Sequence, residues 1–108
     1  MPQYFVAIYR HRDVEPAAVV TEEVAGDIDK LNADMVAAGV RVFVGGLQSP
    51  REARSFSNGS LADGPYLETS SYLDGFWVLD VLSFDEALEW GRKAAVACRA
   101  SVEVRPFH

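Results

Sequence analysis

The sequence predicts an α+β fold, a ferredoxin-like βαββαβ plait that carries a β-hairpin insert. Two observations favour this fold. Apolar runs typical of strands alternate with two segments whose apolar residues recur at helical spacing, in the order strand, helix, strand, hairpin, strand, helix, strand. Two interleaved β-α-β units in that order form a four-stranded antiparallel sheet with both helices on one face. A chain of 108 residues, 49% of them apolar, suits a single domain over residues 1–108.

The first strand and the first helix have the clearest patterns. Residues 4–9 form a continuous apolar run rich in aromatic and branched side chains, which is typical of a strand buried on both faces. From Thr21 onward, apolar residues recur at steps of three and four and predict a helix over residues 21–38. Thr21 can cap its first turn, and Gly39 can supply the left-handed residue that ends it.

The middle of the chain predicts a second strand and then a hairpin. Residues 41–44 favour a strand, and residues 53–57 and 60–62 flank Asn58-Gly59, the dipeptide that best fits a type I′ turn. Residues 66–72 are ambiguous between a loop and a short helix.

The C-terminal third predicts strand, helix and strand. Residues 75–81 are apolar except for Asp80, and Ser83 with Glu86 forms a capping box that starts the second helix. Residues 101–106 alternate between apolar and charged side chains, as in a strand with one face in water.

In this fold the first and third main strands lie in the centre of the sheet. They raise a packing problem, because the helices cover one sheet face and both strands carry large apolar side chains on the other. A second copy of the chain is the simplest cover, so we expect a symmetric homodimer. In the alternative, the hairpin insert or the loop of the 60s folds beneath the sheet.

Charge and composition exclude several partners. Ten Lys and Arg residues against sixteen Asp and Glu give a net charge of −6, which argues against a nucleic acid partner. No segment is long and apolar enough for a membrane span, and the N-terminus lacks the pattern of a signal peptide, so we expect a cytoplasmic protein. Cys98 is the single cysteine, and no His/Cys cluster has metal-ligand spacing, so we expect neither a metal nor another cofactor.

The segment Asp63-Gly64-Pro65-Tyr66-Leu67-Glu68-Thr69 resembles the signature of the YCII-related superfamily, in its DGPF-domain branch. Residues 75–81, 85–90 and 101–106 resemble the same branch in the same order. The resemblance implies a dimeric α+β barrel built from ferredoxin-like subunits. Members of the branch are largely uncharacterised and are known mainly as genomic neighbours of extracytoplasmic-function sigma factors.

The resemblance does not carry over a catalytic residue. Some members of the wider superfamily are proposed to use a His–Asp pair, with the histidine on the first helix. In this chain Ile28 and Ala37 stand at the corresponding positions. We therefore do not expect a histidine-based mechanism. Tyr66 also replaces the usual phenylalanine of the signature, which argues against a shared activity.

Three acids are the candidate catalytic residues: Asp63, Glu68 and Asp80. Paired carboxylates can divide the acid and base roles when their environments separate their pKa values. For Asp63 and Glu68 the structural alternative is that each caps a neighbouring turn or segment. Asp80 lies on an otherwise apolar strand, and a buried carboxylate there needs a partner such as Arg10 or Arg105.

Four residues are the candidate ligand-binding residues: Tyr66, Arg10, His11 and Arg105. An arginine can hold the carboxylate of a small ligand, and a histidine can act as a general base. The structural alternatives are a solvated turn for His11 and a pairing of Arg105 with Glu103 on the same side of the last strand.

Three functions stay open. In the first, a cavity between the two sheets of a dimer binds a small polar metabolite, and the acids carry out an isomerase- or lyase-like proton transfer. In the second, the protein is a non-catalytic ligand-binding or accessory module, with a link to sigma-factor signalling. In the third, a dimer docks on another protein through its acidic surface.

Overall fold

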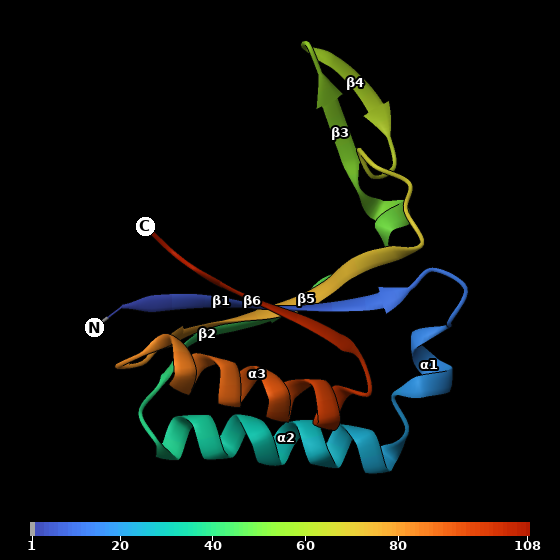
Figure 1. Cartoon of the computed structure of the whole chain (residues 1–108). Coiled ribbons are helices and arrows are strands. Elements are labelled where there is room, and N and C mark those ends of the chain that lie inside the picture. The colour runs from blue at the N-terminus through green and yellow to red at the C-terminus, as the bar shows by residue number, and fades with distance from the viewer. Residues whose placement is uncertain (1) are drawn as a thin grey trace.

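The computed structural model describes residues 2–108, which form one sheet, a layer of helices on one face of it and a hairpin that projects on the other side (Figure 1). The elements in chain order are β1 (Gln3–His11), α1 (Pro16–Val19), α2 (Glu22–Ala37), β2 (Arg41–Gly46), a 3₁₀ turn (Pro50–Glu52), β3 (Arg54–Ser57), β4 (Ser60–Asp63), β5 (Ser71–Asp80), α3 (Phe84–Cys98) and β6 (Ser101–Pro106).

The main sheet has four strands in the order β2-β5-β1-β6, and every neighbouring pair in it is antiparallel. The prediction that the first and third main strands occupy the centre of the sheet is therefore confirmed. Both α2 and α3 lie on the same side of the sheet (Figure 1). This α+β arrangement is compatible with a ferredoxin-like fold.

The two long helices begin at the capping residues that the sequence indicates. The side-chain oxygen of Thr21 accepts a hydrogen bond from the backbone N–H of Val24, and that of Ser83 accepts one from Glu86. The Glu86 carboxylate accepts a hydrogen bond from the backbone N–H of Leu82. A capping box would use the N–H of Ser83, one residue later. These side chains satisfy backbone donors that the first turn of a helix leaves free.

The core lies between the sheet and the helices. It contains alternate residues of the central strands, among them Val6 of β1 and Trp77 of β5, packed against Leu31 and Met35 of α2. The Trp77 indole N–H donates a 2.8 Å hydrogen bond to the side-chain oxygen of Asn32, so the polar edge of the ring has a partner.

The sheet face away from the helices, here called the open face, carries a row of four phenylalanines. Phe43, Phe76, Phe5 and Phe107 follow one another across β2, β5, β1 and the chain end, with successive ring centroids 5.8, 5.2 and 6.1 Å apart. Phe5 and Phe76 are half-buried, and Phe43 and Phe107 are exposed. The prediction of large apolar side chains on both faces of the central strands is confirmed.

The predicted hairpin is present, and we call residues 54–63 the arm. Asn58 and Gly59 have φ angles of 50° and 84°, as a type I′ turn requires. The arm points away from the sheet instead of lying on it (Figure 1). The alternative in which the hairpin insert covers the open face is therefore wrong.

Two short elements and one strand boundary differ from the expectation. The sequence pattern does not predict α1 or the 3₁₀ turn, which are about one turn each. The ambiguous residues 66–72 form a loop as far as Ser70, and β5 begins at Ser71, earlier than the predicted start at residue 75. None of the helices in residues 2–108 is long and apolar enough to cross a membrane.

Candidate functional site

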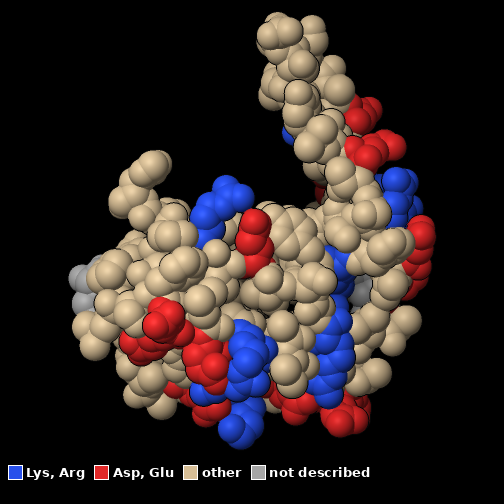
Figure 2. Space-filling model, in the orientation of Figure 1, with Lys and Arg blue, Asp and Glu red and all other residues tan. Residues whose placement is uncertain are grey.

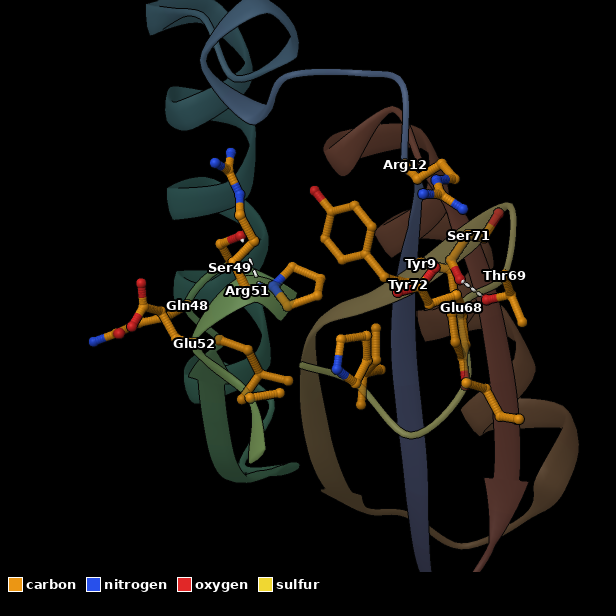
Figure 3. A pocket seen from close by; sticks show the side chains of 16 residues that line it. Tyr9, Arg12, Gln48, Ser49, Arg51, Glu52, Glu68, Thr69, Ser71 and Tyr72 are labelled. Atoms are coloured by element: carbon orange, nitrogen blue, oxygen red, sulfur yellow. Dashed lines mark hydrogen bonds between the residues drawn. The ribbon is translucent and has the colours of Figure 1, made fainter. Parts of the chain in front are cut away.

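A cleft of about 670 Å³ lies where the open face meets the base of the arm. One wall is the segment 47–53, which contains the 3₁₀ turn, and the other is the loop 65–71 that leads into β5. Tyr9 of β1 and Tyr72 of β5 lie between the two walls (Figure 3). A cleft of this volume is large enough for a small metabolite.

The walls combine an apolar lining with a few charged groups. Leu47, Pro50, Pro65, Leu67 and Leu73 supply apolar surface. Arg51 and Glu52 lie on one wall, and Arg12 and Glu68 lie on the other (Figure 3). This composition suits a ligand with an apolar body and a charged or polar group.

Arg12 and Arg51 differ from the other arginines of the chain. Within residues 2–108, neither of their guanidinium groups makes an ion pair or a hydrogen bond. Arg10, Arg54, Arg92, Arg99 and Arg105 each pair with a carboxylate, and Arg41 donates to Asn32. The two arginines without a protein partner therefore line the same cleft.

Tyr72 lines the cleft and carries a neutral hydroxyl group. Burial raises the pKa of the Tyr72 phenol, and the nearby Asp74 carboxylate raises it further. Because the phenol stays protonated at neutral pH, it can donate a hydrogen bond to a ligand.

Backbone hydrogen bonds hold the loop that carries Glu68. Gly64 has a φ of 92°, in the left-handed region that favours glycine. Its N–H donates to the carbonyl of Ala53 at 2.8 Å, and its carbonyl accepts from the Ser55 hydroxyl at 2.7 Å. At the other end of the loop, the Arg12 N–H donates to the carbonyl of Ser70. The Asp-Gly-Pro segment thus ties the cleft wall to the base of the arm.

Of the three candidate catalytic acids, the structure places only Glu68 in the cleft. The Asp63 carboxylate lies 3.2 Å from Arg54 Nε at the base of the arm, with its side chain 90% exposed. Within residues 2–108 the Asp63 side chain pairs with Arg54 and accepts no backbone hydrogen bond, so the alternative in which it caps a turn is wrong. Asp80 lies at the far end of β5, opposite Gln3 of β1. The structure does not bring the three acids together.

The candidate ligand-binding residues lie outside the cleft. Tyr66 is exposed and is not part of the lining. The Arg10 guanidinium is buried, donating to Asp74 at 2.8 Å and to the carbonyl of Cys98 at 3.1 Å. Arg10 is opposite Tyr72 in the β1–β5 register and Asp80 is opposite Gln3, so the interpretation of Arg10 as the partner of Asp80 is wrong.

His11 and Arg105 have local partners. His11 Nδ1 accepts a hydrogen bond from the Asp13 backbone N–H at 3.2 Å, as expected for a turn, and His11 lines a second, more open hollow beside Arg10 and Arg99. Arg105 lies 3.5 Å from the Glu103 carboxylate, so the pairing expected along the last strand is confirmed. Within residues 2–108, no group of three or more His, Cys, Asp or Glu side chains could hold a metal ion.

Sequence reasoning missed four residues that line the cleft: Arg12, Arg51, Glu52 and Tyr72. Ser49-Pro50 was a usable signal for two of them, because a serine before a proline is typical of the start of a helical turn. The Ser49 hydroxyl indeed accepts from the Arg51 N–H at 3.3 Å. Arg12 and Tyr72 reach the same cleft only through the β1–β5 pairing, which a linear pattern does not show.

Comparisons with known proteins identify no function. No model of a known protein family matches the chain. An uncharacterised protein of Rhizobium meliloti (strain 1021) is 45% identical over 47 residues, which is 42% of this chain. The match covers 38% of that protein's length, so the similarity concerns a part of each.

Proposed function

We propose that the protein is a dimeric α+β-barrel member of the YCII-related superfamily, in its DGPF-domain branch, and that it binds a small organic acid in the cleft. The Asp63-Gly64-Pro65 segment at the base of the arm and the strand order support this assignment to the branch. The apolar open face supports the dimer, because a second sheet would remove the phenylalanine row from water.

The observation that carries the binding proposal is the pair of arginines without a protein partner. In a chain with a net charge of −6, Arg12 and Arg51 face one cleft while the other arginines are engaged. A guanidinium group forms two parallel hydrogen bonds to a carboxylate, which fixes the orientation of the ligand. The apolar walls would then hold its hydrocarbon part.

Glu68 is the proposed base for an isomerase- or lyase-like step. It would take a proton from the carbon next to the ligand's carboxyl or carbonyl group, and the neutral Tyr72 hydroxyl would donate a hydrogen bond to the oxygen on which charge develops. This division of roles needs one carboxylate and one phenol, so Asp63 and Asp80 have no part in it.

The mixed surface argues against the alternative in which an acidic surface docks on another protein. On the side seen in Figure 2, Lys and Arg side chains lie among Asp and Glu side chains over the helices. Several of these charges form ion pairs, such as Arg99 with Asp27 at 2.8 Å. This side therefore lacks a continuous acidic patch.

Calorimetric titration with benzoate, phenylacetate and succinate tests the binding proposal. At least one of the two aromatic acids should bind, and Arg12→Gln and Arg51→Gln should each weaken binding about tenfold. Arg92→Gln on α3 is the matched control, because Arg92 pairs with Glu89 outside the cleft. No binding of any probe, or equal affinities in all variants, would contradict the proposal.

Deuterium exchange into phenylpyruvate, followed by proton NMR, tests the role of Glu68. Wild-type protein should accelerate exchange at the carbon next to the carbonyl group. Glu68→Gln should bind the probe with similar affinity and exchange at the uncatalysed rate. If Glu68→Gln exchanges as fast as wild type, Glu68 is not the base and the cleft only binds its ligand.

A further inference from the structure

The arm has almost no support from the rest of its own chain. Strands β3 and β4 contact each other extensively, and within residues 2–108 neither has a comparable contact with another element. Figure 1 shows the arm standing away from the sheet, on the side opposite the helices. An isolated two-stranded hairpin is only marginally stable in water. A stable arm therefore needs another surface to pack against.

The two faces of the arm differ in polarity. Phe56 and Leu61 are cross-strand partners on one face, where they are 68% and 61% exposed. Ser57 and Ser60 are the next pair, so they project on the opposite face. Residues 55–62 carry no charged side chain, and Figure 2 shows the upper part of the arm without Lys, Arg, Asp or Glu. The Phe56–Leu61 face thus fits an apolar protein surface.

The size of the open face indicates why a dimer would use the arm. The four strands have 6, 10, 9 and 6 residues, and at about 4.8 Å between strands and about 3.4 Å per residue they present roughly 500 Å². Specific, stable interfaces bury about 800 Å² on each partner. The sheet alone is smaller than such an interface, and the arm projects on the same side of the molecule with Phe56 and Leu61 exposed.

The charges on the open face favour a second copy as the occupant. Glu103 and Arg105 pair in register with Ala7 and Phe5 of β1, so both lie on the open face. By its register with Gln3, Asp80 lies on the same face, so this surface carries charges of both signs, and opposite charges on it can meet across a two-fold axis. A strongly acidic or strongly basic partner would leave charges of its own sign on this face without an opposite charge.

We propose that the arm is a dimerisation arm, whose Phe56–Leu61 face packs on the second subunit when the two open faces meet. The inference rests on the dimer of the proposed function and adds a specific contact to it. Because Ala53 and Pro65 flank the arm and lie on opposite walls of the cleft, docking of the arm holds both walls in place.

Hydrogen–deuterium exchange of the wild-type chain, measured across a dilution series with sedimentation velocity in parallel, tests this inference. The amides of β3 and β4 should be protected in the dimer, and their protection should fall as dilution produces monomer. A dimer whose arm exchanges as fast as a free peptide would overturn the arm contact and leave the dimer intact. A chain that stays monomeric at all concentrations would overturn both, and an arm equally protected in the monomer would overturn the arm contact.

A pair of double variants separates the two faces of the arm. The double variant Phe56→Ser with Leu61→Ser should raise the dissociation constant of the dimer at least tenfold, because it removes two apolar side chains that would be buried in the interface. Ser57→Ala with Ser60→Ala changes the opposite face of the same hairpin and should leave the constant within about twofold. Equal dissociation constants for the two double variants would contradict the inference.

Discussion

The rings of Phe5 and Phe76 lie 5.2 Å apart, centroid to centroid, on adjacent strands of the sheet face that no helix covers. Phe43 and Phe107 extend this contact on either side. Exposure of such a continuous aromatic row to water is unfavourable, because the burial of apolar surface lowers the free energy. The row is the reason to expect a second sheet against the first.

Neighbouring residues on β5 should respond differently to truncation, because Phe76 faces outward and Trp77 faces the helices. Trp77→Ala should lower the free energy of unfolding by about 3–5 kcal/mol, since it leaves a cavity in the core. Phe76→Ser should mainly weaken self-association. Urea denaturation and sedimentation velocity of both variants separate the two effects. Equal losses of core stability in the two variants would contradict the assignment of faces.

Removing Arg10 should destabilise the fold more than removing a surface charge. The Arg10 side chain is 5% exposed, and its loss leaves the Asp74 carboxylate and the Cys98 carbonyl without their donor. Arg10→Ala should lower the free energy of unfolding by about 3 kcal/mol. Lys30→Ala, which breaks an exposed pair with Asp34, should cost less than about 0.5 kcal/mol. Similar effects in urea denaturation would show that the Arg10 contacts are not structural.

Substitution of two helical glycines by alanine should change the stability of the protein in opposite directions. A Cβ atom at Gly91 of α3 would lie 2.5 Å from Val104 Cγ2, so Gly91→Ala should destabilise the protein by about 1–2 kcal/mol. Nothing lies within 4 Å of a Cβ at Gly26 of α2, so Gly26→Ala should stabilise it by about 0.5–1 kcal/mol. Thermal unfolding measures both changes. A stabilising Gly91→Ala would show that α3 does not pack so closely on β6.

The Cys98 thiol should make stability fall at alkaline pH. Burial raises the pKa of this thiol above its ordinary value of 9.0, and the nearby Arg10 acts in the opposite direction. The folded state favours the neutral thiol. Its contribution to the free energy of unfolding is therefore complete below about pH 9 and is lost as the pH rises through the higher pKa of the folded state. Urea denaturation at several pH values should show a shallower decline for Cys98→Ala than for wild type. Identical declines would contradict this assignment.

The same burial should make Cys98 slow to react in the native protein. The thiolate is the reactive form, and a buried thiol with a raised pKa supplies little of it. Labelling with iodoacetamide near pH 8 should be at least about tenfold slower in the native protein than in urea. Equal rates would indicate that the end of α3 opens readily.

Much of the fold could be predicted from the sequence because its local signals agree. Thr21 and Ser83 cap the long helices, and Asn58-Gly59 forms the expected turn. The direction of the arm could not be predicted, since hairpin chemistry fixes the turn and not the angle at which the hairpin leaves the sheet. One-turn elements such as α1 were missed because they are too short to show a period.

The candidate site could be predicted only in part. Glu68 was identified from the Asp-Gly-Pro segment, and it does line the cleft. Arg10 was one of two suggested partners of Asp80, but it pairs with Asp74, which is 64 positions away and becomes its neighbour only through the pairing of β1 with β5. Arg12 and Arg51 became candidates only when the structure placed them in one cleft without protein partners.

Sedimentation equilibrium over a wide range of protein concentrations is the most direct test of the central claim, that a second copy covers the open face. We expect a species of twice the 11.9 kDa chain mass, which Phe76→Ser converts to the single-chain mass at the same concentrations. A wild-type protein that stays at 11.9 kDa throughout, with its phenylalanine row in water, would contradict it.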